Sequence, residues 1–230
     1  MMNRLFLCVC ILSFMILGAA KNRQKVVEFN TDWISHEPEV LTYRTKGNHG
    51  AALYQVSISK NKEFIEVYIN IISNNFSKTV WGKMSTDMEP MHSKSKIIVG
   101  RRVIMDTNCS YHDKQINIET TMKPYNKVLK NSITYEKPVI DFSQTPFLER
   151  TIPLKVGKKY SFNSLNPRTN KLVPLTIVVL AEESIQDIAC NKIELTTFEG
   201  KSIHWIEKAV PHRILRIEQP EENRVSTLIF

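Results

Sequence analysis

One stretch of the chain, AALYQVSISKNKEFIEVYINIIS at residues 51–73, alternates apolar and polar side chains with a period of two. Successive side chains of a β-strand point to opposite faces, so this alternation is typical of strands with one buried face. The apolar positions are Ala52, Tyr54, Val56 and Ile58 in the first run and Ile65, Val67, Ile69 and Ile71 in the second. A polar turn at residues 60–62 separates the runs, which predicts an antiparallel hairpin.

The same pattern returns in QINIETT (residues 115–121) and NKIELTT (residues 191–197), and RVSTLIF (residues 224–230) predicts a last strand. The run LTIVVLA, from Leu175 to Ala181, is apolar at nearly every position, which predicts a central strand covered on both faces. No repeat or composition shift divides the chain. The sequence therefore predicts a mainly β fold with an antiparallel sheet in one domain.

Helix is scarce, and the best candidate is DFSQTPFLER, from Asp141 to Arg150. Asp141 or Ser143 can accept hydrogen bonds from the first turn of such a helix. Pro146 fits that first turn because its missing N–H has no partner there. We therefore expect one short helix.

The start of the chain has the order of a secretory signal peptide. A basic Met1–Arg4 segment precedes the apolar run Leu5–Leu17, and the small residues Gly-Ala-Ala follow at 18–20. The apolar run is shorter than the roughly 20 residues that span a bilayer. We expect cleavage after Ala20, which leaves a single β-rich domain at 21–230, exported to the periplasm or outside the cell. No second long apolar stretch follows, so no transmembrane segment is expected after cleavage.

Two cysteines, Cys109 and Cys190, remain in the predicted exported domain. In an oxidising compartment an even pair predicts a disulfide, and two buried free thiols are the alternative. The chain carries 31 Lys and Arg against 23 Asp and Glu, a formal charge of +8. These cations are scattered beside acids and turns, which argues against a nucleic-acid partner.

The segment HWIEKAVPHRILRIEQP, residues 204–220, contains two histidines, His204 and His212. His204 and Glu207 are three residues apart and so point to opposite faces of a strand. Pro211 removes a backbone donor and predicts the end of that strand. No third ligand accompanies the histidines, so we expect two strands joined by a turn, with Trp205 in the core, surface or rim histidines and no metal.

Two longer stretches carry a resemblance to a known family. They are PVIDFSQTPFLERTIPLKVGKKYSF (residues 138–162) and IACNKIELTTFEGKSIHWIEKAVPHRILRIEQP (residues 188–220). The order of their motifs resembles a family of bacterial exported proteins, domain-of-unknown-function family 3108. The matching positions are Asp141, Arg150, Pro153, Leu154, Gly157, Trp205, Pro211 and 216–218.

The resemblance implies an exported protein with a strongly curved sheet, a half-barrel or a barrel-like architecture, and no established activity. Asp141 and Arg150 are expected to form an ion pair that fixes the helix to the sheet. The sequence contains neither a glycine-rich phosphate-binding loop nor a Gly-x-Ser-x-Gly nucleophile elbow, and no cofactor is predicted.

Three interpretations of function stay open at this point. The first is an envelope protein that binds an apolar ligand, such as a lipid, or another envelope protein in a β-sheet cavity. The second is a hydrolase or metal-dependent enzyme that uses His92, His204 or His212. The third is a purely structural envelope protein.

Overall fold

The computed structural model describes residues 27–48, 50–136 and 138–230, and these fold around one sheet of 15 strands. The strands are β1 (Glu39–Gly47), β2 (Gly50–Lys60), β3 (Phe64–Ile72), β4 (Phe76–Ser85), β5 (Pro90–Val99), β6 (Arg102–His112), β7 (Gln115–Met122), β8 (Lys127–Thr134), β9 (Val139–Ile140), β10 (Lys159–Asn166), β11 (Lys171–Ile185), β12 (Ile188–Thr197), β13 (Gly200–Glu207), β14 (Ile214–Gln219) and β15 (Arg224–Ile229). The mainly β prediction is confirmed.

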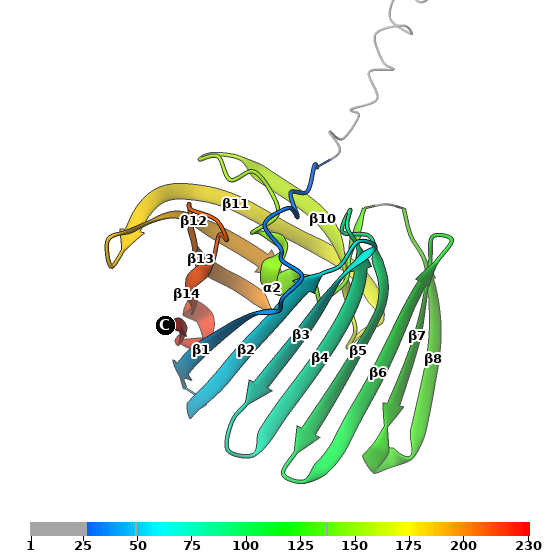
Figure 1. Cartoon of the computed structure of the whole chain (residues 1–230). Coiled ribbons are helices and arrows are strands. Elements are labelled where there is room, and N and C mark those ends of the chain that lie inside the picture. Colours follow the sequence, from blue (N-terminus) through cyan, green and yellow to red (C-terminus); the bar gives the residue numbers. More distant parts are fainter. Residues whose placement is uncertain (1–26, 49, 137) are drawn as a thin grey trace, which may run out of the picture.

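Neighbouring strands follow the order β8-β7-β6-β5-β4-β3-β2-β1-β15-β14-β13-β12-β11-β10-β9. All pairs are antiparallel except β9 with β10. The last strand pairs with the first, for example Tyr43 with Leu228, and thereby joins an N-terminal half (β1–β8) to a C-terminal half (β9–β15) (Figure 1). In the described part of the chain the edge strands β8 and β9 do not pair with each other, so the sheet is not closed.

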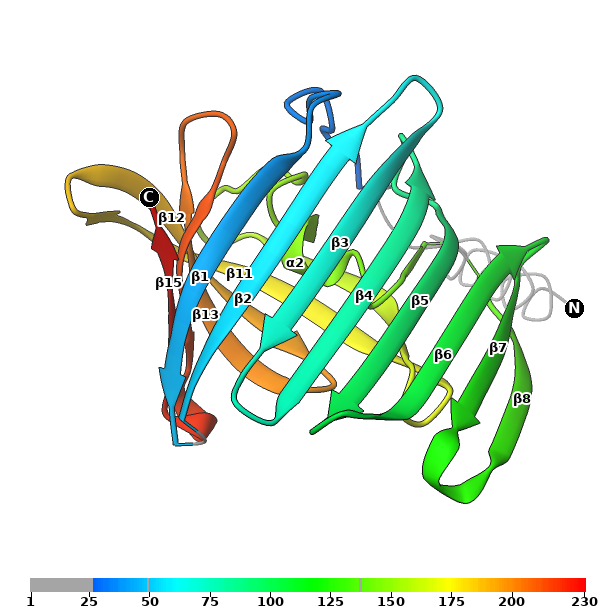
Figure 2. The ribbon, with the colours of Figure 1, turned by 60° about the horizontal axis from the view of Figure 1, so that its bottom comes forward.

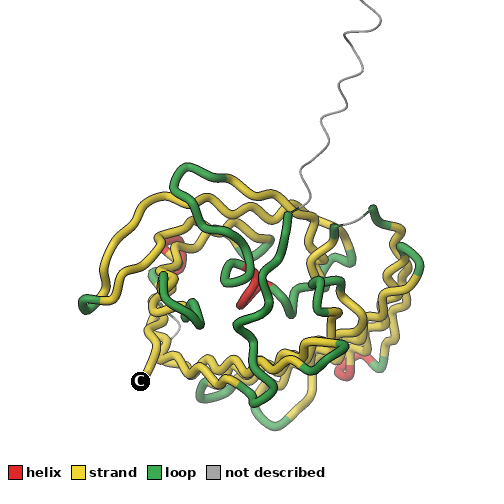
Figure 3. The backbone as a smooth tube through the Cα atoms, turned by 45° about the horizontal axis from the view of Figure 1, so that its top comes forward, coloured by secondary structure: helices red, strands yellow, loops and turns green. Residues whose placement is uncertain are grey.

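Residues 139–152, which we call the internal segment, connect the two halves and lie between them. Figure 3 shows strands on both sides of this segment, and Figure 2 shows helix α2 (Thr145–Leu148) behind the N-terminal strands. Every residue of the segment is buried except Thr145 and Pro146, which are half-buried. This short segment, which contributes buried apolar side chains such as Phe147 and Leu148, fills the core between the two halves.

The contact between the internal segment and the sheet is closest at Gly82 on β4. A Cβ atom at this position would lie 2.1 Å from Ser143 Oγ and 3.1 Å from a methyl group of Val67. Real Cβ atoms do not approach other atoms so closely, so only glycine permits the segment to pass over β4 here.

The alternating pattern of the sequence has the expected consequence in the sheet. The predicted hairpin is formed by β2 and β3, and Ile65, Val67 and Ile69 are all buried. The prediction that Leu175–Ala181 is covered on both faces is wrong. Leu175 on β11 is fully buried, whereas Leu180 is 42% exposed, because strands of the described sheet are packed only on their inner face at this position.

Helix α2 is shorter than predicted, and it is the only α-helix among the described residues. Pro146 lies in its first turn, as expected, but neither Asp141 nor Ser143 is its N-cap. Gln144 occupies that position without a capping hydrogen bond from its side chain. Instead, Gln144 Nε2 donates to the carbonyl of Met88, which fixes the helix to the β4–β5 turn.

The predicted signal peptide at 1–20 lies outside the described residues. Among the residues that are described, no helix has the length and apolar composition needed to cross a membrane.

Candidate functional site

A cavity of about 630 Å³ lies between the two halves of the sheet. Its walls come from β1–β4, from β12–β15 and from the start of α2. Most of the wall is apolar, formed by Tyr54, Ile69, Ile71, Phe76, Val80, Phe142, Pro146, Leu195, Phe198, Ile214 and Ile217. This volume falls within the range typical of small-molecule binding sites.

One end of the cavity is surrounded by the turns between β1 and β2, β3 and β4, β12 and β13, and β14 and β15. Turn residues there, such as Asn48 and Glu199, are exposed, whereas Ile214 at the other end is buried. The cavity therefore opens among the turns.

Charged side chains stand at this opening. Lys78 on β4 lies 4.0 Å from Glu199, across the opening in the other half of the sheet. Arg224 pairs with Glu222 at 3.1 Å, and its Nε–H also donates to the side-chain oxygen of Gln219. The cavity thus has an apolar interior and a charged entrance.

A buried histidine, His204 on β13, lies in the cavity wall. It is 5% exposed, and the prediction of a surface or rim histidine is therefore wrong. Its Nε2 is 2.8 Å from Ser202 Oγ, and its Nδ1 is 2.6 Å from Glu149 Oε1. With Nδ1–H donating to Glu149, Nε2 of the ring accepts from the Ser202 hydroxyl, which also lies 3.5 Å from the carbonyl oxygen of Leu195.

Glu149 belongs to the internal segment and is fully buried, and its Oε2 has no hydrogen-bond partner among the described residues. The neighbouring Arg150 fixes this end of the segment. Its guanidinium donates to Glu39 Oε2 and to the carbonyl of Pro211, each at 2.7 Å, and stacks at 4.1 Å from the ring of Trp33. Arg150 thereby connects the segment to β1 and to the β13–β14 turn.

The expected ion pair between Asp141 and Arg150 is not formed, because each side chain has partners at its own end of the internal segment. Asp141 Oδ2 accepts from Ser93 Oγ at 2.9 Å and from the hydroxyl of Tyr111, and Oδ1 accepts from the amide of Ser143 at 2.8 Å. Complete burial raises the pKa of Asp141, and these hydrogen bonds partly oppose that shift.

The predicted disulfide is also absent, since Cys109 and Cys190 are both free and buried. Cys109 lies on β6 in the N-terminal half and Cys190 on β12 in the C-terminal half. Burial, with a smaller effect of the nearby Asp141 charge, raises the pKa of Cys109 to about 12. Burial also raises the pKa of Cys190. Both thiols therefore have the character of core residues.

The other positions that match the suggested family are structural in their contacts. Pro153 accepts a hydrogen bond from the hydroxyl of Tyr160, and Leu154 packs against the core. Gly157 has φ +80°, a conformation that favours glycine in the turn before β10.

Trp205 and Pro211 belong to the predicted strand–turn–strand element, which β13 and β14 confirm. Trp205 is 7% exposed and donates from Nε1 to Glu183 at 2.8 Å. Pro211 follows β13 and offers its carbonyl to Arg150.

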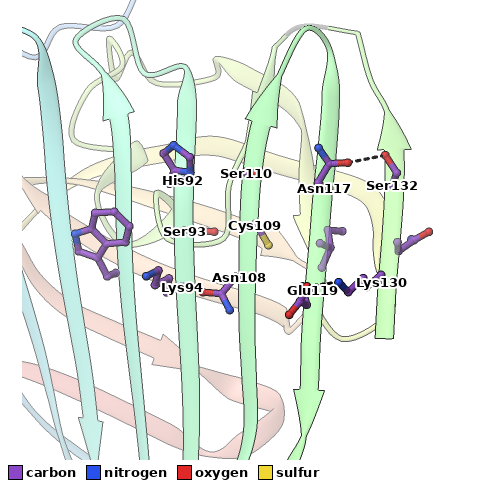
Figure 4. A pocket seen from close by; sticks show the side chains of 13 residues that line it. His92, Ser93, Lys94, Asn108, Cys109, Ser110, Asn117, Glu119, Lys130 and Ser132 are labelled. Atoms are coloured by element: carbon purple, nitrogen blue, oxygen red, sulfur yellow. Dashed lines mark hydrogen bonds and ion pairs between the residues drawn. The ribbon is translucent and has the colours of Figure 1, made fainter. Parts of the chain in front are cut away.

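A second hollow, of about 750 Å³, lies over β4–β8 (Figure 4). Strand pairing places Trp81, Lys94, Asn108, Glu119 and Lys130 in one row across it. Lys130 pairs with Glu119 at 3.0 Å. Such a row of paired polar side chains is the usual solvated face of a sheet.

The three histidines of the enzyme interpretation are not brought together. His92 is on β5 beside His112, with ring centres 5.7 Å apart, and burial followed by the charge of His112 lowers its pKa. His204 lies on β13, and His212 follows Pro211 in the turn. The described residues contain no group of three His, Cys, Asp or Glu side chains arranged to hold a metal ion.

Ser202 and Glu149 were not predicted as site residues. The spacing of Ser202 and His204, two residues apart on a predicted strand, places them on one face and was available in the sequence. No comparable signal marks Glu149, which is 55 residues away from His204.

No known protein family matches the chain, and a search of curated proteins finds no significantly similar sequence. The resemblance to family 3108 stays a prediction.

Proposed function

We propose that this protein binds an elongated apolar ligand with a polar head, such as a fatty acyl chain, in the cavity between the halves of the sheet. The observation that carries the proposal is the cavity itself, about 630 Å³ with a mostly apolar wall. Burial of an acyl chain there removes apolar surface from water, which contributes about 0.8 kcal/mol for each CH₂ group.

The entrance supports a polar or anionic head group. Lys78 and Arg224 both line the cavity near its opening, and each has an acidic neighbour that holds it in place. A carboxylate or phosphate entering among the turns would exchange contacts with these cations. The alkyl part would extend toward Ile214 and Phe142.

Displacement of a dansyl-labelled undecanoic acid by dodecanoate tests the proposal. The variant Ala52→Trp introduces a large side chain at a half-buried position of the cavity wall. We expect it to weaken binding by at least about tenfold, which corresponds to about 1.4 kcal/mol.

Leu53→Trp is the matched control, because Leu53 is the next residue of β2 and is 48% exposed on the opposite face. It should bind like the wild type. Equal affinity of both variants would place the ligand elsewhere. If the wild type binds no label at all, the proposal fails, and the purely structural interpretation of the sheet gains support.

The proposal includes two features that the resemblance to family 3108 implies. The protein is exported, and its sheet acts as a half-barrel around the ligand. A curved sheet with a charged entrance suits a carrier that shields an acyl chain in an aqueous envelope compartment. N-terminal sequencing of protein exported by its host should then begin at Lys21.

A further inference from the structure

Two polar side chains in the wall of the cavity, Ser202 and His204, form a continuous chain of hydrogen bonds with Glu149 behind the wall. Ser202 Oγ lies 2.8 Å from His204 Nε2, and His204 Nδ1 lies 2.6 Å from Glu149 Oε1. A nucleophile bonded to a base, with that base oriented by a buried acid, is the arrangement that activates serine in acyl transfer.

We propose that Ser202 and His204 are the catalytic residues of an ester hydrolase, with Glu149 as the residue that positions His204, and that the substrate is an acyl ester bound in the cavity. The inference rests on the proposed function, because the cavity must first hold the acyl chain. It adds a chemical step that a carrier does not need.

The local fold sets the position of each of the three groups. Ser202 and His204 are two residues apart on β13 and therefore share the face that lines the cavity. Strand β13 is paired on both sides, with β12 and with β14. Glu149 comes from the internal segment, which Arg150 connects to Glu39 and to Pro211. Glu149 itself lies in the buried turn directly after helix α2.

The position of Ser202 fits a substrate with its ester group near the entrance. Ser202 follows the β12–β13 turn at the opening, whereas Ile214, the pairing partner of Ile206, lies deeper. An acyl chain extending inward from Ser202 would contact the apolar wall.

Donors for the negative charge of the intermediate stand in the same part of the cavity. Gln219 follows Glu218, the pairing partner of Ile203, and so lies beside Ser202 on the neighbouring strand. Its amide oxygen accepts from Arg224 Nε, which fixes the orientation of the amide. The amide N–H groups of Gln219 and the guanidinium of Arg224 are the donors that would stabilise the oxyanion.

The reaction uses only the ester and water. The Ser202 Oγ–H transfers its proton to His204 Nε2 while Oγ forms a bond to the carbonyl carbon. The tetrahedral intermediate collapses, the bond to the alcohol oxygen breaks, and His204 returns the proton to that oxygen. Water then attacks the acyl-serine in the same way, releasing the fatty acid and restoring the serine hydroxyl.

The proposed reaction gives a role to Glu149 Oε2, which has no hydrogen-bond partner among the described residues. A buried carboxylate oxygen without a hydrogen bond is costly, and such groups are rare in proteins. When His204 becomes positively charged during the reaction, this carboxylate stabilises the charge directly. The cost in the resting protein is thereby offset in the charged state.

The test combines hydrolysis of p-nitrophenyl dodecanoate with covalent trapping by an alkyl fluorophosphonate. The wild type should release p-nitrophenol and gain one phosphonyl adduct, which peptide mass spectrometry locates at Ser202. Ser202→Ala should lower kcat/KM by about 1000-fold or more and take no adduct. Ser164→Ala is the matched control, because Ser164 is a buried serine on β10 that does not line the cavity.

Glu149→Gln tests the positioning role separately. It should lower kcat while leaving KM and the displacement of the labelled fatty acid nearly unchanged, a separation that a general loss of structure would not produce. Since adduct formation is measured on the wild type, a Ser202→Ala variant that fails to fold does not remove the test.

Two negative results have different meanings. A wild type that binds dodecanoate but gives neither turnover nor an adduct overturns the catalytic inference and leaves the carrier proposal intact. A wild type that does not bind the labelled fatty acid overturns the proposed function. An adduct on a residue other than Ser202 contradicts the assignment of the nucleophile.

Discussion

The internal segment carries two buried carboxylates, Asp141 and Glu149, and they differ in how their oxygens are used. Both oxygens of Asp141 accept hydrogen bonds, from Ser93, Tyr111 and Ser143, and none of these groups belongs to the cavity between the halves. Among the described residues, Glu149 has one bonded oxygen, and the partner of that oxygen, His204, lines the cavity.

Both carboxylates are buried, so hydrogen bonding and not burial distinguishes the structural group, Asp141, from the functional group, Glu149. A fully bonded carboxylate fixes the segment to β5 and β6, which is a structural role. Glu149 is only partly hydrogen-bonded and is connected to the cavity through His204, so it can stabilise a positive charge that forms on His204. Buried groups without partners need an explanation, and position relative to the cavity supplies one here.

The largest expected effect comes from removing the anchor. Asp141→Ala leaves the hydroxyls of Ser93 and Tyr111 and the amide of Ser143 without their acceptor in the core. Each unsatisfied buried group costs about 1–3 kcal/mol, so we expect the free energy of unfolding to fall by roughly 3 kcal/mol or more. Urea denaturation measures this loss.

The control for this variant is Glu63→Ala, in the exposed β2–β3 turn, which should change stability by less than about 0.5 kcal/mol. Folded Asp141→Ala protein should still bind the labelled fatty acid with wild-type affinity. A small stability change, or a selective loss of binding, would remove the distinction between the two carboxylates.

A second, smaller effect concerns pH. Because burial raises the pKa of Asp141, the native state keeps this proton after the unfolded chain, with a pKa of about 3.9, has lost it. Stability contributed by this group therefore falls as pH rises from about 4 through the raised pKa. The variant Asp141→Asn has no titratable group at this position and therefore serves as the reference.

The stability of the wild type minus that of Asp141→Asn should thus decrease as pH rises through this window and then become constant. Denaturation of both proteins at a series of pH values measures the difference. A difference that increases with pH would mean that the hydrogen bonds outweigh burial and lower the pKa.

The smallest effect is expected at the thiols. Cys109 and Cys190 are buried and free, and burial raises the pKa of both, so neither should react with Ellman's reagent until the protein unfolds. A reductant should leave the melting temperature unchanged. Two thiols should be titrated in urea when the protein begins at Lys21, which removes Cys8 and Cys10. Recovery of a peptide containing Cys109 and Cys190 joined by a disulfide would contradict the structure.

The sequence predicted the parts of the fold that follow from local periodicity. The hairpin of β2 and β3, the last strand, and the turn at Pro211 between β13 and β14 all result from alternation or from proline chemistry. The exposure of one face of LTIVVLA was not predictable, because composition does not reveal whether another layer covers the outer face of β11. Leu180 remains exposed there.

The candidate site was harder to predict because its members come from distant parts of the chain. The prediction that His204 lies on a strand was correct. The environment of its side chain, however, depends on the internal segment, which brings Glu149 to Nδ1. Charge complementarity suggested an Asp141–Arg150 pair, yet the segment holds these residues at opposite ends, where hydroxyls and Glu39 are available instead. Pairing across such distances requires the fold.

Hydrogen–deuterium exchange with and without dodecanoate tests most directly the claim that the two ends of the internal segment have different roles. The account predicts that bound dodecanoate slows exchange in peptides from β2, β3 and β13, while peptides from β5 and β6 that contain Ser93 and Tyr111 exchange at unchanged rates. Slower exchange confined to β5 and β6, with no change at β13, would contradict it.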